Sequence, residues 1–119
     1  MLPEYRQLYQ SFRHRLQQLQ AQIGMDPSAL HPPFQDVQTF FHQKILPGNL
    51  ETLDATEAAK IQSFQVEINK QLRLLGTDLM FLQAARLSAT QSQRQQQISQ
   101  RLDLLLRYCE AVLAEEEGQ

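Results

Sequence analysis

A seven-residue repeat of apolar residues limits the folds open to this chain more than any other feature. The repeat consists of Ile61, Ile68, Leu75 and Leu82, with Phe64, Leu72 and Leu79 at helical spacing beside them. This spacing gives a helix a continuous apolar seam, which must pack against other helices. It predicts one long helix over residues 54–87, begun either by the capping pair Asp54 and Glu57 or by a cap at Thr56. Three or four repeats do not distinguish a bundle helix from a coiled coil.

Apolar periodicity and the positions of glycine and proline predict three further helices. With the long helix, the predicted set covers residues 3–23, 33–46, 54–87 and 90–116. Gly24 is expected to stop the first helix in a left-handed conformation, and residues 25–32 are expected to form a loop. Thr90 and Gln93 are expected to cap the start of the fourth helix.

The predicted helices fit one compact fold. The break between the third and fourth helices is so short that the two must form an antiparallel hairpin. We therefore expect an all-α, up-down antiparallel helical bundle with a long central hairpin, three long helices and one short. A chain of 119 residues is too short for two cores, so residues 1–119 are expected to form a single domain.

Composition excludes several classes of protein. The chain is 42% hydrophobic and has no apolar run of about 18 residues, which argues against disorder and against a membrane span. Its formal net charge of -2 argues against a nucleic-acid binder. Twenty residues are glutamine, which we expect on helix surfaces. A single cysteine and the lack of a signal-peptide pattern favour a cytoplasmic location.

Residues that could support catalysis or metal binding are few. The three histidines, His14, His31 and His42, have no helical metal-pair spacing. Cys109 falls at a core position, where we expect a small buried hydrophobic side chain. No glycine-rich phosphate loop is present. We therefore expect no enzymatic activity, no metal and no cofactor.

Arginines occur on two of the predicted helices. They are Arg6, Arg13 and Arg15 on the first helix and Arg94, Arg101 and Arg107 on the fourth. They could be ordinary solvated helix faces, or they could form a modest basic surface for an acidic partner. Asp103 and Glu110 lie among them and would repel nucleic-acid phosphates.

Residues 71–86 are apolar on nearly every side of the predicted helix. Leu74, Met80 and Phe81 all lie away from the seam. Such a segment is either surrounded by its own bundle or exposes a patch to a partner or a second copy. Asp78 and Arg86 would be costly there unless they are paired, whereas Arg73 lies on a face that is more easily solvated. Gly76 is expected to mark a close helix crossing.

The same segment resembles a known family. The matching residues are Ile68-Asn69-Lys70-Gln71-Leu72-Arg73-Leu74-Leu75, Asp78-Leu79-Met80-Phe81-Leu82-Gln83-Ala84-Ala85-Arg86, Arg101-Leu102 and Leu106-Arg107-Tyr108-Cys109. They resemble the cyanobacterial family of the heterocyst frequency control protein PatD. The resemblance implies a small non-enzymatic regulator that binds the tubulin-like division protein FtsZ and promotes its assembly. In filamentous cyanobacteria such a protein would link cell division to heterocyst frequency.

No contact residues are transferred from the family, so the candidates come from the sequence itself. The expected partner-binding residues are Arg73, Asp78, Met80, Phe81, Arg86, Arg94 and Arg101. Two other hypotheses remain open at this point. One is a structural homodimer closed by the patch on the third helix. The other is a small-ligand bundle with a pocket lined by Phe34, Phe40, Phe41 and Phe64.

Overall fold

The computed structural model describes residues 3–48, 50 and 53–117, without the side chains of 115–117. Its α-helices are α1 (Pro3–Ala21), α2 (His31–Phe40), α3 (Ala55–Ala84) and α4 (Ser88–Glu117). A 3-10 turn, η1 (Pro27–Leu30), precedes α2, and a π-helical turn, η2 (Phe41–Ile45), continues it. Among the described residues there is no β-strand. The predicted all-α helical bundle is confirmed.

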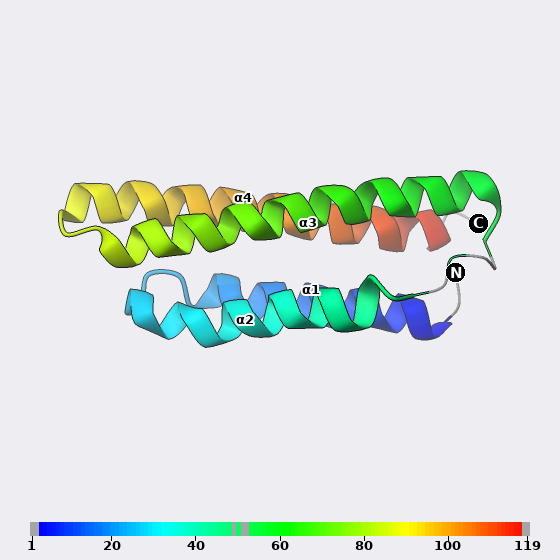
Figure 1. The fold of residues 1–119 in the computed structure, drawn as a ribbon, viewed down its shortest axis with the longest axis horizontal. Coiled ribbons are helices and arrows are strands. Elements are labelled where there is room, and N and C mark those ends of the chain that lie inside the picture. The colour runs from blue at the N-terminus through cyan, green and yellow to red at the C-terminus, as the bar shows by residue number, and fades with distance from the viewer. Residues whose placement is uncertain (1–2, 49, 51–52, 118–119) are drawn as a thin grey trace.

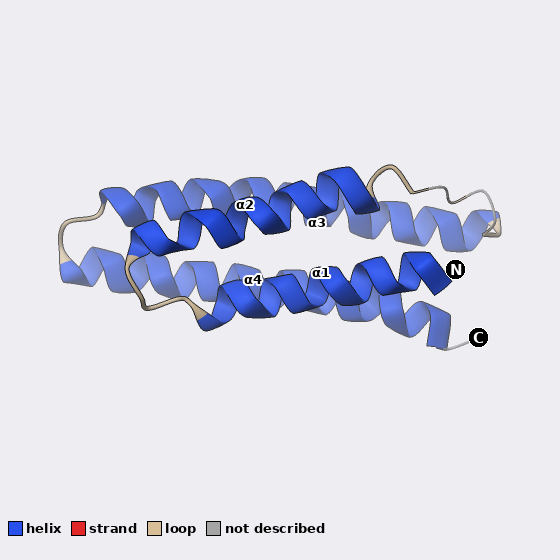
Figure 2. Ribbon diagram, turned by 90° about the horizontal axis from the view of Figure 1, so that it is seen from below, coloured by secondary structure: helices blue, strands red, loops and turns tan. Residues whose placement is uncertain are grey.

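The helices form two antiparallel hairpins that lie side by side, α1 with α2 and α3 with α4 (Figures 1 and 2). α1 packs against α2 and α4, while α3 packs against α4, α2 and η1. Successive helices run up and down along the long axis of a rod that measures 51 × 20 × 19 Å. This is the predicted up-down topology.

The seam of α3 lies in the core as the repeat predicts. All four residues of the seven-residue repeat are at most 3% exposed. Opposite them, α1 contributes Tyr9, Phe12 and Leu16, and α4 contributes Ile98 and Leu102, all fully buried. Each such aliphatic or aromatic side chain stabilises the fold by about 1.5–3 kcal/mol through burial alone. The apolar seams of three long helices therefore account for the bundle.

Helix starts and stops are only partly as predicted. The carboxylate of Asp54 accepts a hydrogen bond from the backbone N–H of Glu57 at 2.8 Å, and Gly24 has φ of +99°, as expected. The loop predicted over residues 25–32 is wrong, because residues 27–30 form η1 and α2 begins at His31. The predicted cap at Thr90 is also wrong, since α4 begins two residues earlier at Ser88. Proline is favoured in the first turn of a helix, and the first turn of α2 includes Pro32 and Pro33. The helix therefore begins two residues before the predicted start at residue 33.

Two glutamines are buried in the core, contrary to the expectation that glutamines lie on the surface. Gln65 and Gln71 are each 8% exposed. The side-chain amide of Gln65 donates to the hydroxyls of Tyr5 and Tyr9, and the Tyr5 hydroxyl donates to the carbonyl of Ile45 at 3.2 Å. Because these buried polar groups bond to one another, their desolvation is offset. Burial raises the pKa of both tyrosines, so the network is neutral.

The α3–α4 hairpin is longer than the hairpin that covers it. In both views the connection between α3 and α4 extends beyond the connection between α1 and α2 (Figures 1 and 2). At that end the bundle is only two helices thick. Side chains near the α3–α4 connection therefore have fewer neighbours to bury them.

Candidate partner-binding surface

The part of the α3–α4 hairpin nearest its connection is basic in an acidic protein. We call residues 68–102 the distal hairpin. It contains five Lys or Arg residues and one acidic residue, which gives it a net charge of +4. The rest of the chain contains six Lys or Arg residues and twelve acidic residues, which gives a net charge of -6. Its single acidic residue is Asp78. The distal hairpin therefore presents a positive field although the whole chain is negative.

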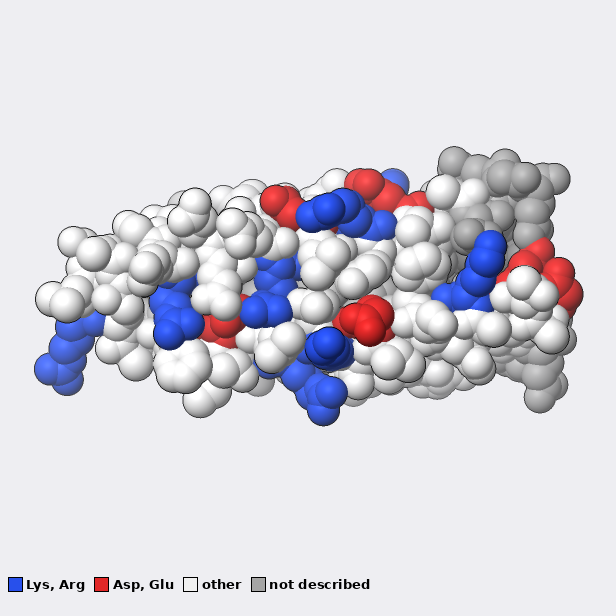
Figure 3. Space-filling view, turned by 90° about the horizontal axis from the view of Figure 1, so that it is seen from above, with Lys and Arg blue, Asp and Glu red and all other residues white. Residues whose placement is uncertain are grey.

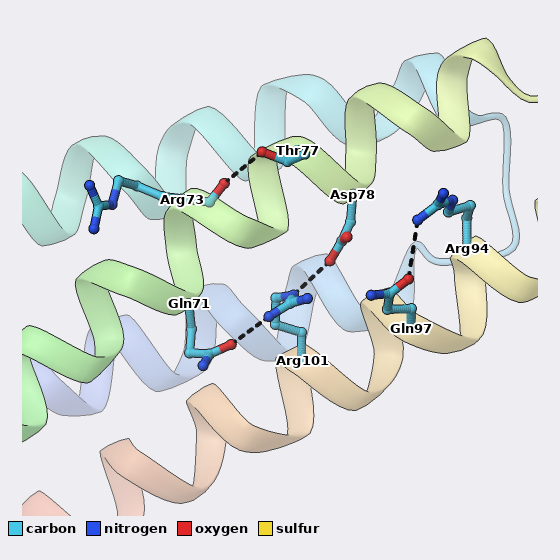
Figure 4. Close-up of polar contacts among 7 residues, drawn as sticks. All are labelled: Gln71, Arg73, Thr77, Asp78, Arg94, Gln97 and Arg101. Atoms are coloured by element: carbon cyan, nitrogen blue, oxygen red, sulfur yellow. Dashed lines mark hydrogen bonds and ion pairs between the residues drawn. The ribbon is translucent and has the colours of Figure 1, made fainter.

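Asp78 is held inside the bundle by α4. It is 5% exposed, and its carboxylate accepts a hydrogen bond from Nε of Arg101 at 2.6 Å. The same guanidinium donates from Nη1 to Oε1 of Gln71 at 2.7 Å (Figure 4). Gln71 and Asp78 lie two turns apart on one side of α3, so one arginine satisfies both. This network links α3 to α4.

The network changes the role of two predicted site residues. Asp78 and Arg101 were expected to contact a partner, and the structure instead pairs them with each other. The physical reason is that Asp78 lies three residues after Leu75 and four before Leu82, so the seam carries it into the core. A carboxylate there requires a cation, and Arg101 on the facing helix provides it.

Phe81 is exposed but covered on one face by an arginine. Its side chain is 51% exposed, and the guanidinium carbon of Arg94 lies 4.7 Å from the centre of its ring. Arg94 also donates to Oε1 of Gln97 at 3.3 Å, one turn along α4 (Figure 4). A guanidinium over an aromatic face is attracted by the ring quadrupole. Phe81 and Arg94 thus form a preassembled pair that can accept an acidic or an apolar partner group.

Arg73 lies on a different side of α3. It is exposed and points away from the Arg101 network (Figure 4). Within the described part of the chain, neither its guanidinium nor that of Arg86 has a carboxylate within salt-bridge distance. Both cations are therefore free to pair with a carboxylate of another molecule.

A groove runs between α2 and α3 beside Arg73. We call it the α2–α3 groove; it has a volume of about 320 Å³, and its lining includes Phe34, Gln38, Arg73, Gly76, Met80 and Gln83. Gly76 allows the close approach of the two helices, because a Cβ atom there would lie 3.1 Å from Cζ of Phe34. The close crossing expected at Gly76 is present. Met80, at the edge of the groove, is 71% exposed.

The α3–α4 connection exposes a further apolar residue beside a cation. Leu87 is 71% exposed, and Arg86 before it is exposed as well. The side-chain amide of Gln91 donates to the carbonyl of Ala85 at 3.0 Å, which holds the connection against the start of α4. On the face in Figure 3, this end of the molecule is mostly uncharged, with separate Lys and Arg side chains and little acidic surface.

Two arginines of α1 are engaged within the fold. Arg15 pairs with Asp36 of α2 at 2.6 Å and lies 4.4 Å from the ring of Phe40. Arg6 donates to the carbonyl of Leu113 at 3.3 Å. These contacts tie α1 to its two neighbouring helices, so Arg6 and Arg15 act within the molecule.

The remaining candidates for chemistry lie in the core. Cys109 is fully buried, and desolvation raises the pKa of its thiol to about 12, although Arg13 partly opposes this. A thiol with so high a pKa is a poor nucleophile at neutral pH.

Across the described residues, no three His, Cys, Asp or Glu side chains form a group that could hold a metal ion. None of the described helices has the length of apolar sequence that a bilayer crossing requires.

The four phenylalanines proposed to line a ligand pocket lie in different places. The rings of Phe40 and Phe41 are 6.5 and 5.4 Å from that of Phe12, whereas Phe64 lies 6.1 Å from Tyr108. Phe34 packs against Gly76. The side chains that were expected to surround one ligand instead fill separate parts of the helix interfaces.

The chain was compared with family models, curated proteins and solved structures. No family model, no curated protein and no solved structure matches the chain. The candidate surface is therefore defined by its own residues.

The burial of Gln65 and Gln71 was not predicted, although the sequence contains a signal for it. Gln65 lies four residues after Ile61 and three before Ile68, and Gln71 lies three after Ile68. These are seam positions. Polar residues at seam positions mark internal networks, whereas Arg73 and Met80, which lie off the seam, remain on the surface.

Proposed function

We propose that this protein is a non-enzymatic regulator that binds the cell-division protein FtsZ through its distal hairpin and promotes FtsZ assembly. The observation that supports protein binding most strongly is the exposure of Met80 (71%) and Phe81 (51%) beside arginines that have no acidic partner in the part of the chain that the structure describes. Exposed apolar groups next to free cations are typical of protein-interaction sites. The choice of FtsZ rests on the resemblance of residues 68–86 and about 98–109 to the PatD family.

The distal hairpin suits an acidic partner such as a protein of the FtsZ type. Arg73 and Arg86 can each form charge-assisted hydrogen bonds to a carboxylate, and Met80 and Leu87 can bury apolar area beside them. Such contacts make association sensitive to salt. A protein that binds polymerised FtsZ more tightly than the free subunit shifts the equilibrium toward polymer by mass action. Promotion of assembly therefore needs no catalytic group on this chain.

Sedimentation of FtsZ polymer, with and without this protein, tests the proposal. We expect more FtsZ in the pellet when the protein is present, and we expect the protein itself in the pellet. Both effects should weaken as ionic strength rises. Equal pelleting of FtsZ, with none of this protein in the pellet, would reject the assignment to FtsZ.

An Arg107→Ala variant is a matched control for variants of the distal hairpin. Arg107 is exposed on α4 and lies 13 residues from Arg94, about 20 Å along the helix. Its side chain carries the same guanidinium group as the candidate arginines, but it lies outside the distal hairpin. Its loss should leave pelleting unchanged, which would separate a defined surface from general attraction of basic residues to an acidic polymer.

The alternative of a structural homodimer draws on the same exposed apolar residues. A twofold contact uses the same patch on both copies, so Arg86 and Arg94 would face their own counterparts or lie close to them. Like charges at such an interface oppose association. A solution mass near 13.8 kDa is expected for the free protein, and a stable mass of twice that value would favour the homodimer instead.

A further inference from the structure

The α2–α3 groove is shaped to receive an apolar side chain. Its volume of about 320 Å³ lies at the lower end of the range for ligand sites, about 300–1,000 Å³. Its inner wall is apolar, since Phe34 and Leu79 line it and are only 7% and 6% exposed. Because Gly76 has no side chain, the ring of Phe34 packs directly against α3 and forms part of the groove wall. A space of this size accommodates one or two aliphatic side chains.

The charges around the groove indicate which charged group of a ligand would bind beside the apolar side chain. Arg73 lines the groove and has no carboxylate partner in the described part of the chain. No acidic residue is among the lining residues. The nearby acids are already engaged, because Asp36 of α2 pairs with Arg15 and Asp78 of α3 pairs with Arg101. The complementary group is therefore a carboxylate next to an apolar side chain.

Uncharged polar groups at the groove favour a polypeptide. Gln38 on α2 and Gln83 on α3 present side-chain amides to it. Gln83 donates to the carbonyl of Pro27 at 3.4 Å, which leaves its own carbonyl oxygen able to accept from a peptide N–H. A lipid surface needs a projecting apolar ridge, whereas here the apolar wall is recessed and bordered by amides.

We infer that the α2–α3 groove is the docking site for an acidic segment of a protein partner, with an aliphatic side chain in the groove and a carboxylate on Arg73. The inference deepens the proposed function, because it rests on the partner being a protein, but it does not require that partner to be FtsZ. It also separates the two exposed sides of α3, since it assigns docking to the side of Arg73 and Met80.

A methyl NMR titration tests the inference directly. The chain has three methionines, so protein labelled with ¹³C at the methionine methyl groups gives three signals, and the Met80→Leu variant identifies that of Met80. The probe is the capped peptide Asp-Glu-Leu-Asp-Glu-Leu-Asp. Its controls replace both leucines with serine, or replace each acid with its amide. We expect the Met80 signal to shift with the acidic leucine peptide and to shift far less with either control.

Charge reversal at Arg73 should weaken this binding at least about tenfold, because an attractive contact becomes repulsive. Arg107→Glu, with the same change in net charge on an exposed site of α4, should change the dissociation constant less than about twofold. The inference is overturned if the peptide leaves the Met80 signal unmoved, if Arg73→Glu binds like the wild type, or if the uncharged peptide binds equally well. A Met80 signal that responds to phosphatidylglycerol vesicles and not to the peptide would assign the groove to a lipid surface.

Parallel sedimentation with FtsZ separates this inference from the proposed function. If the peptide shifts Met80 but the protein never pellets with FtsZ, docking in the groove stands and the choice of FtsZ is wrong. If the protein pellets with FtsZ but the peptide leaves Met80 unmoved, the choice of FtsZ stands and docking in the groove is wrong.

Discussion

The two sides of α3 in the distal hairpin contain similar residues and use them differently. Toward α4, the carboxylate of Asp78 is bonded to Arg101, and the ring of Phe81 is covered by Arg94. Toward α2, Arg73 has no carboxylate partner among the described residues, and Met80 is 71% exposed. The difference comes from the facing helix. α4 supplies Arg101 to the buried Asp78 and Arg94 to the exposed Phe81, whereas the one carboxylate of α2, that of Asp36, is paired with Arg15, and a groove remains beside Arg73. A charged residue on a helix thus becomes structural or available according to its neighbour.

The largest expected effect concerns the buried side of this comparison. Replacing Asp78 with alanine removes the partner of Arg101 and leaves a mostly buried guanidinium uncompensated. Breaking such a pair costs about 3 kcal/mol of unfolding free energy. Urea unfolding of Asp78→Ala and of Arg73→Ala measures the contrast. An Asp78→Ala variant as stable as the wild type would show that the network contributes little to the fold.

A smaller effect is expected from filling the groove. Gly76→Leu places a side chain against Phe34, and such overpacking costs about 1–3 kcal/mol, offset by about 1 kcal/mol from better helix propensity. We expect a lower melting temperature and loss of peptide binding. Gly76→Ala should be nearly neutral in stability, because its Cβ needs only a slight shift of Phe34. An unchanged melting temperature for Gly76→Leu would contradict the close helix crossing.

The Phe81–Arg94 pair should contribute about 0.5–1 kcal/mol, as expected of an exposed cation–π contact. A double-mutant cycle with Phe81→Ala and Arg94→Ala isolates this coupling from the separate effects of each residue. A coupling free energy near zero would mean that the two side chains are independent in solution. The α4 side of the distal hairpin would then be as open as the α2 side.

The smallest effect on stability is expected at the α2–α3 groove itself. Arg73→Ala and Met80→Ser remove exposed side chains, so each should change the unfolding free energy by less than about 0.5 kcal/mol. Partner binding should nevertheless fall for both variants. Thermal unfolding by circular dichroism, with binding measured on the same samples, checks this separation. A large loss of stability in either variant would place that residue in the fold instead.

Much of the fold could be predicted from the sequence because the dominant signal is periodic and local. The repeat from Ile61 to Leu82 and the cap at Asp54 define α3, and the short break after it defines the hairpin. The start of α4 was misplaced, since helix propensity and packing override a single capping pattern such as Thr90 with Gln93. The first turn of α2 was missed because prolines permit a helix start as well as a loop.

The candidate site was less predictable because it depends on contacts between helices. Arg73 and Arg101 are the same residue type, and both lie in long helices with few other charges. The position of Arg73 off the seam predicts its exposure, but no local pattern specifies that Arg101 faces the carboxylate of Asp78 on the other helix. Gln71 is a second example: its seam position predicts that the side chain is buried, but it does not predict the hydrogen bond to Arg101.

Co-sedimentation of Arg73→Ala with FtsZ polymer tests the central claim most directly, namely that the open side of α3 is the side that binds the partner. The wild-type protein and the Arg107→Ala control should pellet with the polymer. Arg73→Ala should remain in the supernatant although its melting temperature is unchanged. If the folded Arg73→Ala protein pellets as the wild type does, the claim that the open side of α3 binds the partner is contradicted. If the wild type itself never pellets with the polymer, the choice of FtsZ is contradicted.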